Sequence, residues 1–404
     1  MAGKYIPPHL RQRLANVEAS AVANTEPSDR IAPLNLAAST LNDSEVKIIE
    51  VKLVATYNWI DRLTPTILGP GLPSTWNPPR QRHPVDPDEI GRFVDQNVDR
   101  IPHSPVEPLI RAVLTVQPEF AFEGLDIVPN GLLNFAREPK EYSAFKFGVQ
   151  LVGKTLIFVR MEDNTRDYFT RPQYRIAFEQ IYTAVESVAK RTTSHHRILN
   201  YKFGGLNLLV RSVADAYLPK HPSVATEQRD ESSMADLDPE VAKGVLVLEG
   251  GRIVPQAAIL KLTTRFAFSK QQFRIAAKIP DLWISQTPHF VEAYYEHEKP
   301  IWETFSPRAI FDTPKLTDVR DMVQDWEARG AHHLQKFAGF LHQIVETVRT
   351  SRPDGPKDLV QLVNPSLRRQ GADLTIERAG PEHFADLPKE FEGLFGARKL
   401  QKDE

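Results

Sequence analysis

FGGLNLLVRSVADAYL, Phe203–Leu218, lies at the centre of the chain and determines the fold that we expect. Its apolar run over Leu206–Ala216 predicts a buried strand. The pair Gly204-Gly205 separates this run from a second expected strand, Arg197–Phe203, and marks a turn between the two. The central part of the chain is therefore expected to contribute neighbouring strands to a sheet.

We expect a strand and a helix before this central segment and a hairpin after it. Lys154–Arg160 (KTLIFVR) predicts a strand, and Gln173–Lys190 carries apolar residues at helical spacing. Further on, Gly244–Glu249 and Ile253–Thr264 flank Gly250-Gly251, which predicts a hairpin. The order of strand, helix, strand and hairpin resembles the core of the PD-(D/E)XK nuclease superfamily. That resemblance implies an α/β (α+β) fold, a mixed sheet flanked by helices.

The rest of the chain predicts an arm, one domain and a tail. Residues 1–44 lack a sustained apolar period, as expected for a disordered arm. Within them, KYIPPHLRQRL (Lys4–Leu14) resembles the YIPPHLR-type segment of eukaryotic DEAD-box RNA helicases, either as a docking motif for a protein partner or as a chance basic, proline-rich start. Residues 45–396 are expected to form a single nuclease-like domain, with a disordered acidic insertion at about 221–240. Residues 397–404 form a polar tail.

Composition narrows the function classes. The 404 residues contain no cysteine, which excludes a thiolate zinc site, a cysteine nucleophile and disulfides. No apolar run approaches the ~20 residues of a membrane span, and the start of the chain has no run of signal-peptide length. We therefore expect no membrane partner and an intracellular location, cytoplasmic or nuclear. The net charge of −2 gives no overall basic field, so DNA is not expected and an RNA site would have to be a local patch.

Three segments carry a more specific resemblance. FGGLNLLVRSVADAYL, AAILKLTTRF (Ala257–Phe266) and LWISQTPHFVEAYY (Leu282–Tyr295) resemble an uncharacterised fungal family that is itself similar to the decapping exoribonucleases of the DXO type. Those enzymes carry an E-x-D motif on one strand and E-L-K on the next. The two-residue spacing turns the acid and the lysine to one face of a strand. The carboxylates hold Mg²⁺, which activates water.

The motif positions of this chain depart from that pattern, so the resemblance implies degenerate catalytic positions. Val213-Ala214-Asp215 stands at E-x-D, and Lys261-Leu262-Thr263 stands at E-L-K. Asp215 matches the metal-binding aspartate, but Val213 replaces an acid, Lys261 replaces the second acid and Thr263 replaces the lysine. One carboxylate is a poor Mg²⁺ site. We expect Lys261 to pair with Asp215 instead.

A cofactor is therefore not expected at these positions. Mg²⁺ or Mn²⁺ would require Asp215 and ligands from elsewhere, of which Glu249 and Glu292 are the nearest in sequence. Each of these glutamates could instead be an ordinary solvated carboxylate at a turn or strand edge, without a functional role. Asp215 itself could serve only as a hydrogen-bond acceptor at a strand end or a helix cap.

A phosphate-binding surface does not need a metal. The basic residues expected to line it are Arg197, Lys202, Arg211, Lys261 and Arg265. Tyr201 and Trp283 could supply stacking faces for single-stranded RNA, although a core position is favoured for Trp283. The alternative is that these charges form a solvated rim.

Three functions remain open on this basis. The preferred one is a catalytically degenerate nuclease-fold protein that binds RNA or a protein partner in RNA metabolism. The second is an active, metal-dependent enzyme that processes or decaps RNA 5′ ends with relocated ligands. The third is a protein scaffold without nucleic-acid binding.

Overall fold

The structure is a computed structural model, and it describes residues 30–34, 46–89, 91–93, 95–129, 146–161, 166–167, 172–224, 244–269, 275–299, 307–350, 359–363, 374–378 and 387–395. Several expected features lie outside these residues. They are most of the arm, most of the acidic insertion and the polar tail.

The central hairpin forms as its sequence predicts. β12 (Thr192–Phe203) and β13 (Leu206–Ala214) pair antiparallel, with His196 opposite Val213 and Phe203 opposite Leu206. Gly204 and Gly205 have φ angles of 58° and 77°, a backbone that L side chains rarely adopt. Both positive φ values suit the tight turn between right-twisted strands.

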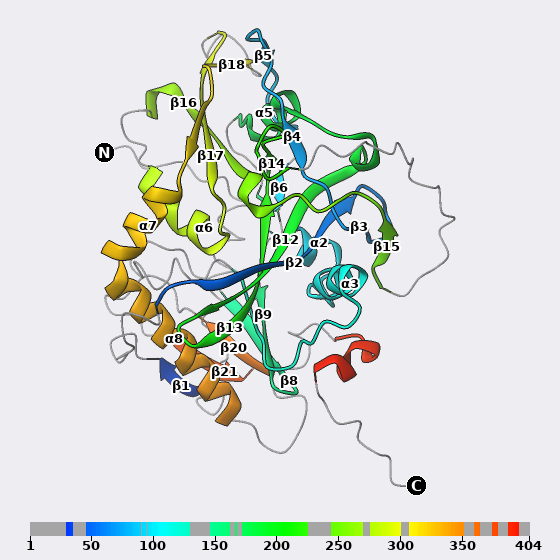
Figure 1. Cartoon of the computed structure of the whole chain (residues 1–404), viewed down its shortest axis with the longest axis vertical. Coiled ribbons are helices and arrows are strands. Elements are labelled where there is room, and N and C mark those ends of the chain that lie inside the picture. Colours follow the sequence, from blue (N-terminus) through cyan, green and yellow to red (C-terminus); the bar gives the residue numbers. More distant parts are fainter. Residues whose placement is uncertain are drawn as a thin grey trace, which may run out of the picture.

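Within the described residues, two sheets account for nearly all strands (Figure 1). The larger is, in spatial order, β1 (Arg30–Leu34), β21 (Leu374–Arg378), β20 (Leu359–Val363), β8 (Lys146–Val152), β9 (Thr155–Met161), β7 (Asp126–Pro129), β13, β12, β2 (Ile49–Ile60), β3 (Thr66–Gly69) and β15 (Leu246–Glu249). The smaller is β11 (Thr183–Ala184), β4 (Ser74–Trp76), β14 (Ala216–Tyr217), β16 (Ile259–Phe266), β17 (His289–His297), β18 (Ala309–Phe311) and β5 (Pro84–Val85), with β19 (Lys315–Asp318) beside β17. A ribbon of β6 (Arg92–Phe93) and β10 (Arg166–Asp167) stands apart from both.

Both sheets are mixed, which confirms the expected fold class. β13 is antiparallel to β12 but parallel to β7, and β16 is parallel to β17. The helices are α2 (Gln96–Arg100), α3 (Glu107–Val116), α5 (Arg175–Tyr182), α6 (Ile279–Ile284), α7 (Arg320–Arg329) and α8 (Ala331–Thr350). Short 3-10 turns are η3 (Ser187–Ala189), η4 (Gln256–Ala258), η5 (Ala267–Ser269), η6 (Ile275–Ala277) and η9 (Lys389–Phe395). Among the described helices, none is long and apolar enough to cross a membrane.

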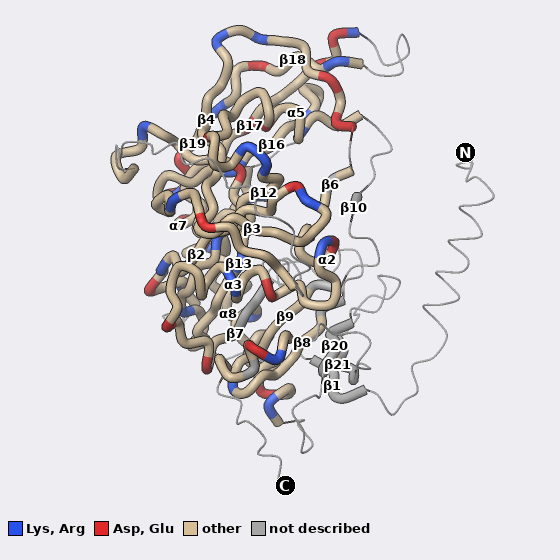
Figure 2. Tube along the Cα trace, turned by 90° about the vertical axis from the view of Figure 1, so that its right-hand side faces the viewer, with Lys and Arg blue, Asp and Glu red and all other residues tan. Residues whose placement is uncertain are grey.

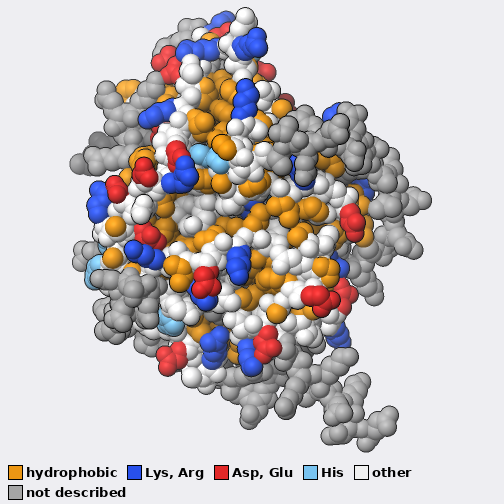
Figure 3. Space-filling view, viewed as in Figure 1, with side chains coloured by type: hydrophobic (Ala, Val, Ile, Leu, Met, Phe, Trp, Pro, Cys, Tyr) orange, Lys and Arg blue, Asp and Glu red, His pale blue; other side chains and the backbone are white. Residues whose placement is uncertain are grey.

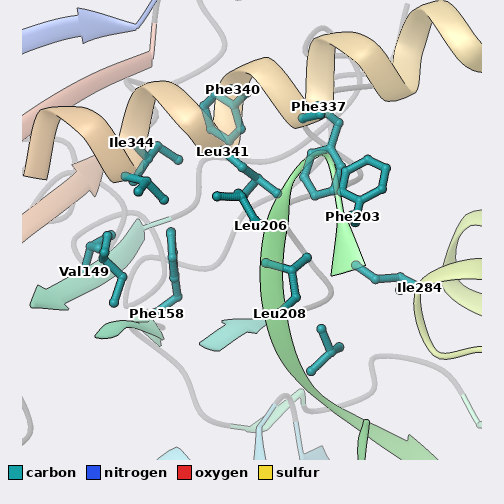
Figure 4. Packing of buried hydrophobic residues seen from close by; sticks show 14 of the residues in the cluster. Val149, Phe158, Phe203, Leu206, Leu208, Ile284, Phe337, Phe340, Leu341 and Ile344 are labelled. Atoms are coloured by element: carbon teal, nitrogen blue, oxygen red, sulfur yellow. The ribbon is translucent and has the colours of Figure 1, made fainter. Parts of the chain in front are cut away.

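The principal core lies between α8 and the larger sheet. Phe337, Leu341 and Ile344 are buried, and they point from α8 toward the strands (Figure 4). Leu206 and Leu208 meet them from β13. Burying apolar area at about 25 cal/mol per Å² makes this contact the main reason that the amphipathic helix docks.

The opposite face of the larger sheet is covered by α3. Its buried residues Leu109, Ile110 and Val113 pack with Trp59 of β2, in a second core cluster. Pro108 lies in the first turn of α3, where its missing N–H costs little. The larger sheet is thus flanked on both faces by helices.

Several local predictions were wrong in extent or in pairing. The helix predicted over Gln173–Lys190 is only α5, because Ile181 and Val185 are exposed and the chain turns into β11 after Tyr182. The amphipathic pattern of Thr317–Thr350 predicts one long helix, but the structure has two helices there, α7 and α8, that meet at Gly330. Arg30–Leu34, inside the predicted arm, is a strand paired with β21.

The hairpin predicted at Gly250-Gly251 does not form. β15 pairs in parallel with β3 in the larger sheet, whereas β16 belongs to the smaller sheet. Gly251 instead allows a close approach, since a Cβ there would lie 2.5 Å from the carbonyl oxygen of Pro70. The segment after Thr64 is rich in proline, which predicts no regular element, yet it supplies this β3 partner and the short strands β4, β5 and β6.

Candidate functional site

Asp215 lies where the chain passes from one sheet to the other. β13 of the larger sheet ends at Ala214, and β14 of the smaller sheet begins at Ala216. The backbone N–H of Asp215 donates to the carbonyl of Leu260 on β16 at 3.3 Å. Asp215, which stands at the E-x-D motif position, therefore connects the two sheets, and we call this connection the Asp215 joint.

The carboxylate of Asp215 uses both of its oxygens for protein contacts. The guanidinium of Arg175 donates to Oδ1 at 2.8 Å. The backbone N–H of Leu262 donates to Oδ2 at 2.6 Å. Arg175 also donates to the carbonyl oxygen of Leu262. Asp215 and Arg175 together satisfy both backbone groups of one residue on β16.

The side chains of Asp215 and Arg175 supply hydrogen bonds to β16 beyond the point where β14 stops pairing with it. β14 pairs with β16 only through Ala216 and Tyr217, opposite Leu260 and Ile259. At Leu262 an acceptor from Asp215 and a donor from Arg175 take the place that a neighbouring strand would fill. Since an unpaired backbone group costs free energy when it is buried, this clamp stabilises the edge of β16.

A second acid fixes the start of the helix that carries Arg175. The carboxylate of Asp88 accepts hydrogen bonds from the backbone N–H groups of Ile176 and Ala177, at 3.1 and 2.8 Å. An acceptor at this end of α5 satisfies donors that have no partner inside the helix. Asp88 thereby helps to hold Arg175 toward Asp215.

The electrostatics keep the carboxylate of Asp215 ionised. Burial by itself would raise the pKa of Asp215, but attraction by Arg175 and Lys261 and the hydrogen bond from Leu262 outweigh it and lower the pKa. Burial would lower the pKa of Arg175, but Asp215 and Glu179 raise it. Among the described ion pairs, the partner of Asp215 is Arg175, so the predicted direct pair with Lys261 was wrong. Lys261 acts on Asp215 only through longer-range attraction.

The other motif positions present a different face. Lys261 and Thr263 are half-buried and share one face of β16, while Leu260 and Leu262 point to the core. Val213 is 40% exposed, although an apolar side chain there ligates nothing. Glu292 lies opposite Thr263 on β17, and burial raises its pKa. The other candidate ligand, Glu249, is an exposed residue at the end of β15 in the larger sheet.

The residues around Asp215 do not fit Mg²⁺ or Mn²⁺. A hard cation needs several oxygen ligands, and both oxygens of Asp215 already face donors. No group of three or more His, Asp or Glu side chains occurs at metal-binding distance among the described residues. A positively charged guanidinium at 2.8 Å opposes a second cation at the same carboxylate.

Three of the predicted phosphate contacts lie elsewhere in the molecule. Arg197 is 1% exposed and donates to Gln256 and to the carbonyl of Val254, so it joins β12 to the segment before β16 and cannot reach a phosphate at the surface. Burial lowers the pKa of Arg197 to about 9. Arg211 forms an ion pair with Asp95, in which a guanidinium nitrogen lies 2.5 Å from a carboxylate oxygen.

Lys202 belongs to the far end of the hairpin. It is exposed and pairs with Glu50 at 2.8 Å. Lys202 lies seven positions along β12 from His195, which is opposite Ala214, so Lys202 is about 24 Å from the Asp215 joint. Of the five predicted cations, Lys261 and Arg265 are the two that share one face of β16. Figure 2 colours the Lys and Arg positions along the chain trace, on which β16 is labelled.

The two aromatic residues proposed for stacking are parts of the core. Tyr201 is 1% exposed, and its hydroxyl donates to the carbonyl of Ile284 at 2.9 Å. Trp283 is equally buried, and its indole N–H donates to Glu327 at 2.9 Å. For Trp283 the favoured core interpretation is confirmed.

Sequence reasoning missed a buried polar cluster on β2, β12 and α2. The side-chain oxygen of Asn97 accepts hydrogen bonds from the hydroxyl of Tyr57 and the indole of Trp59, both at 2.8 Å. His196 stacks on Tyr57 with ring centroids 4.6 Å apart. The only local signal was Asp95, which caps α2 by accepting from the backbone of Asn97. No sequence signal connects α2 to β12.

A family model matches residues 36–361, more than half of the chain, and its description is Domain of unknown function (DUF8563). The chain belongs to this family. No curated protein matches the chain.

Solved structures of Rai1 have a similar fold. S. pombe Rai1 is 11% identical with a TM-score of 0.50, and the match covers 86% of this chain and 99% of that chain. Scheffersomyces stipitis Rai1 is 10% identical with a TM-score of 0.52, covering 91% and 98%. Candida albicans Rai1 in complex with pU5-Mn²⁺ is 9% identical with a TM-score of 0.51, covering 91% and 100%. The predicted resemblance to the DXO-type nucleases is confirmed at the level of the fold.

Proposed function

We propose that this protein is a catalytically inactive member of the nuclease fold that works in RNA metabolism by binding RNA. The observation that carries the loss of catalysis is the Arg175–Asp215–Leu262 clamp, in which both carboxylate oxygens are engaged. The side chain of Asp215 holds a structural joint, so it is not available to a metal. Val213, Lys261 and Thr263 supply no replacement acid.

RNA is favoured as the partner by two observations of different kinds. Similar folds include a Rai1 structure in complex with the RNA pU5. In this chain, Lys261 and Arg265 follow one another on the same face of β16, and Lys315 lies opposite Glu292 on the adjoining β19. Cations spaced along neighbouring strands contact phosphates without any metal.

The decisive experiment measures turnover and binding on the same preparation. RNAs with a 5′ cap, a 5′ triphosphate or a 5′ monophosphate are incubated with the full chain and Mg²⁺ or Mn²⁺, and products are resolved on a gel. We expect no turnover, together with saturable RNA binding in fluorescence polarisation that weakens as salt rises.

Two results would contradict this function. Metal-dependent turnover that is lost in Asp215→Ala and kept in the matched variant Asp312→Ala would support an active enzyme with relocated ligands. Absence of RNA binding would support a protein scaffold, whereas RNA binding unchanged in Lys261→Glu/Arg265→Glu would place the RNA site away from β16. Arg197 is not a useful position for this test, because its buried side chain serves the fold.

A further inference from the structure

Glu292 places a carboxylate among the cations that are proposed to contact RNA. It lies on β17, between β16 and β19, directly opposite Thr263 of β16 and Lys315 of β19. Residues opposite one another on neighbouring strands share a face of the sheet. Lys261 and Arg265 share that face too, because they lie two residues either side of Thr263. The carboxylate and the cations therefore form one surface.

The carboxylate of Glu292 differs from that of Asp215, because in the part of the chain that the structure describes no hydrogen bond or ion pair engages it. Lys315 and Arg265 attract it only over a longer distance. Glu292 is half-buried, and burial raises its pKa despite this attraction. Loss of hydration without a hydrogen-bond donor is unfavourable for a charged group. A ligand that brings donors to Glu292 would remove this cost.

A carboxylate is unsuited to phosphate binding. The phosphodiester groups of RNA are anionic and carry no donor, so Glu292 repels them while its neighbours attract them. The donors that RNA does offer are on the base edges and the 2′-hydroxyl. On the face of the molecule in Figure 3, acidic and basic side chains are interspersed, so a local contact and not a broad field of one sign would decide which RNA binds.

The geometry of a carboxylate favours one base. Its two oxygens accept hydrogen bonds side by side. Guanine presents two donors side by side on its Watson–Crick edge, the N1–H and the exocyclic amino group. In adenine and cytosine the amino group lies beside a ring nitrogen that is an acceptor, and in uracil one N–H lies between two carbonyl oxygens. These acceptors repel a carboxylate, so the edge of guanine matches Glu292 best.

We infer that Glu292 selects guanine in single-stranded RNA by accepting hydrogen bonds from the N1–H and amino groups of the base. The cations on either side of Glu292 contact the adjacent phosphates. The inference rests on the proposed RNA binding and deepens it, because it names the base that this surface reads. A duplex does not fit, because its guanines are already paired on this edge.

Oligouridylates with a single central guanine, adenine, cytosine or uracil test the selection of the base. Their affinities for the full chain are measured by fluorescence polarisation. We expect the guanine RNA to bind about tenfold more tightly than the other three, within the usual range for a bidentate contact to a base. Inosine in place of guanine removes only the amino group, and it should lose most of this preference.

Glu292→Gln separates base selection from charge. The variant keeps the shape of the side chain but has a single acceptor oxygen and no negative charge. Guanine RNA should bind about fivefold less tightly, whereas all-uracil RNA should bind about twofold more tightly because the repulsion of its phosphates is removed. A folding defect would weaken the binding of both RNAs.

Glu296→Gln is the matched control. Glu296 is an exposed residue on the same face of β17, four positions further along, and the substitution removes the same charge. It should leave the guanine preference unchanged.

The outcomes distinguish this inference from the function on which it rests. If the wild type binds all four RNAs within twofold of one another, base selection is wrong while RNA binding stands. The inference is also overturned if Glu292→Gln tightens all four equally or keeps the guanine preference. If the wild type binds none of the RNAs, the proposed function itself fails.

Discussion

At the scale of single residues, Asp215 and Arg175 form a structural clamp on the backbone of β16. The side chains of Asp215 and Arg175 are 11% and 25% exposed, and each satisfies the other and the backbone of Leu262. Removing one member of a buried pair leaves the other charge uncompensated, which costs more than the pair contributes. The clamp is thus a sensitive position for stability.

We expect Asp215→Asn and Arg175→Met each to lower the free energy of unfolding by about 3–5 kcal/mol, the usual cost of breaking a buried pair. The matched control is Arg82→Met, which breaks the pair between Arg82 and Asp312. That pair is solvent-exposed, so its loss should cost less than about 1 kcal/mol. Urea denaturation monitored by Trp fluorescence gives the three values, and equal losses at both pairs would refute a structural clamp.

Two buried histidines predict an acid-sensitive fold. Burial, with repulsion by Arg211, lowers the pKa of His196 to about 3, and burial with repulsion by Arg197 lowers the pKa of His195 well below its usual value. The unfolded chain takes up a proton at each near pH 6.5, whereas the folded chain does not until far lower pH. The stability of the fold is therefore lost progressively as the pH falls below 6.5.

The expected slope is about 1.4 kcal/mol per pH unit for each histidine below about pH 5.5. The lowered pKa of Asp215 acts in the same direction, but only below its unfolded value near pH 4. Urea midpoints between pH 7 and pH 4.5 measure the slope, and His196→Gln should reduce it by about half. An unchanged slope in that variant would mean that His196 is protonated in the folded state.

At the scale of elements, the turn between β12 and β13 is the feature that sequence predicted best. Gly205 has a φ of 77°, and a Cβ there would lie 3.8 Å from His342, so space is available while the backbone conformation is unfavourable. Gly205→Ala should therefore cost about 1–2 kcal/mol from backbone strain alone. Gly393→Ala, where nothing lies within 4 Å and no positive φ occurs, should be nearly neutral.

Thermal unfolding of the two alanine variants tests this turn. Gly205→Asn is an informative third variant, because asparagine tolerates the left-handed region better than alanine does and should recover part of the loss. A Gly205→Ala variant as stable as Gly393→Ala would show that the turn adopts another conformation in solution.

Elements were predictable where the signal is local. Leu206–Ala214 and Thr155–Met161 are apolar runs long enough for strands, and both form. The glycine pair at 250–251 carries the same local signal as the pair at 204–205, yet its flanking strands belong to different sheets. The difference is the parallel partner β3, which comes from a proline-rich segment with no strand signal of its own.

The site was predictable only in part, for a related reason. Asp215 and Lys261 were identified from motif spacing, which is a property of single strands. Arg175 lies 40 residues before Asp215, on a helix that is separate from both motif strands. Its contact with Asp215 depends on how α5 packs beside β16, and no periodicity in the sequence encodes that packing.

At the scale of the whole molecule, the Asp215 clamp predicts what would be needed to create a metal site. The changes Val213→Glu, Lys261→Glu and Thr263→Lys restore the E-x-D and E-L-K residue types. We expect this triple variant to bind Mn²⁺ poorly, because Arg175 still occupies the carboxylate of Asp215. Adding Arg175→Ala should tighten Mn²⁺ binding at least about tenfold.

Isothermal titration calorimetry with Mn²⁺ measures both variants, and folding is checked by the unfolding midpoint of each. Adding Asp215→Asn to the quadruple variant should remove the binding, which serves as the control for an unrelated surface site. Equal affinity of the triple and quadruple variants would show that Arg175 does not block the carboxylate.

The arginine in the clamp also differs from a bound metal ion because it cannot dissociate from the protein. A metal ion occupies its ligands according to its concentration and affinity, so dilution or a chelator empties the site. A guanidinium that is part of the polypeptide is present at full occupancy whenever the chain is folded. The joint between the two sheets is therefore indifferent to the divalent cations around it, and EDTA should leave the unfolding midpoint of the protein unchanged.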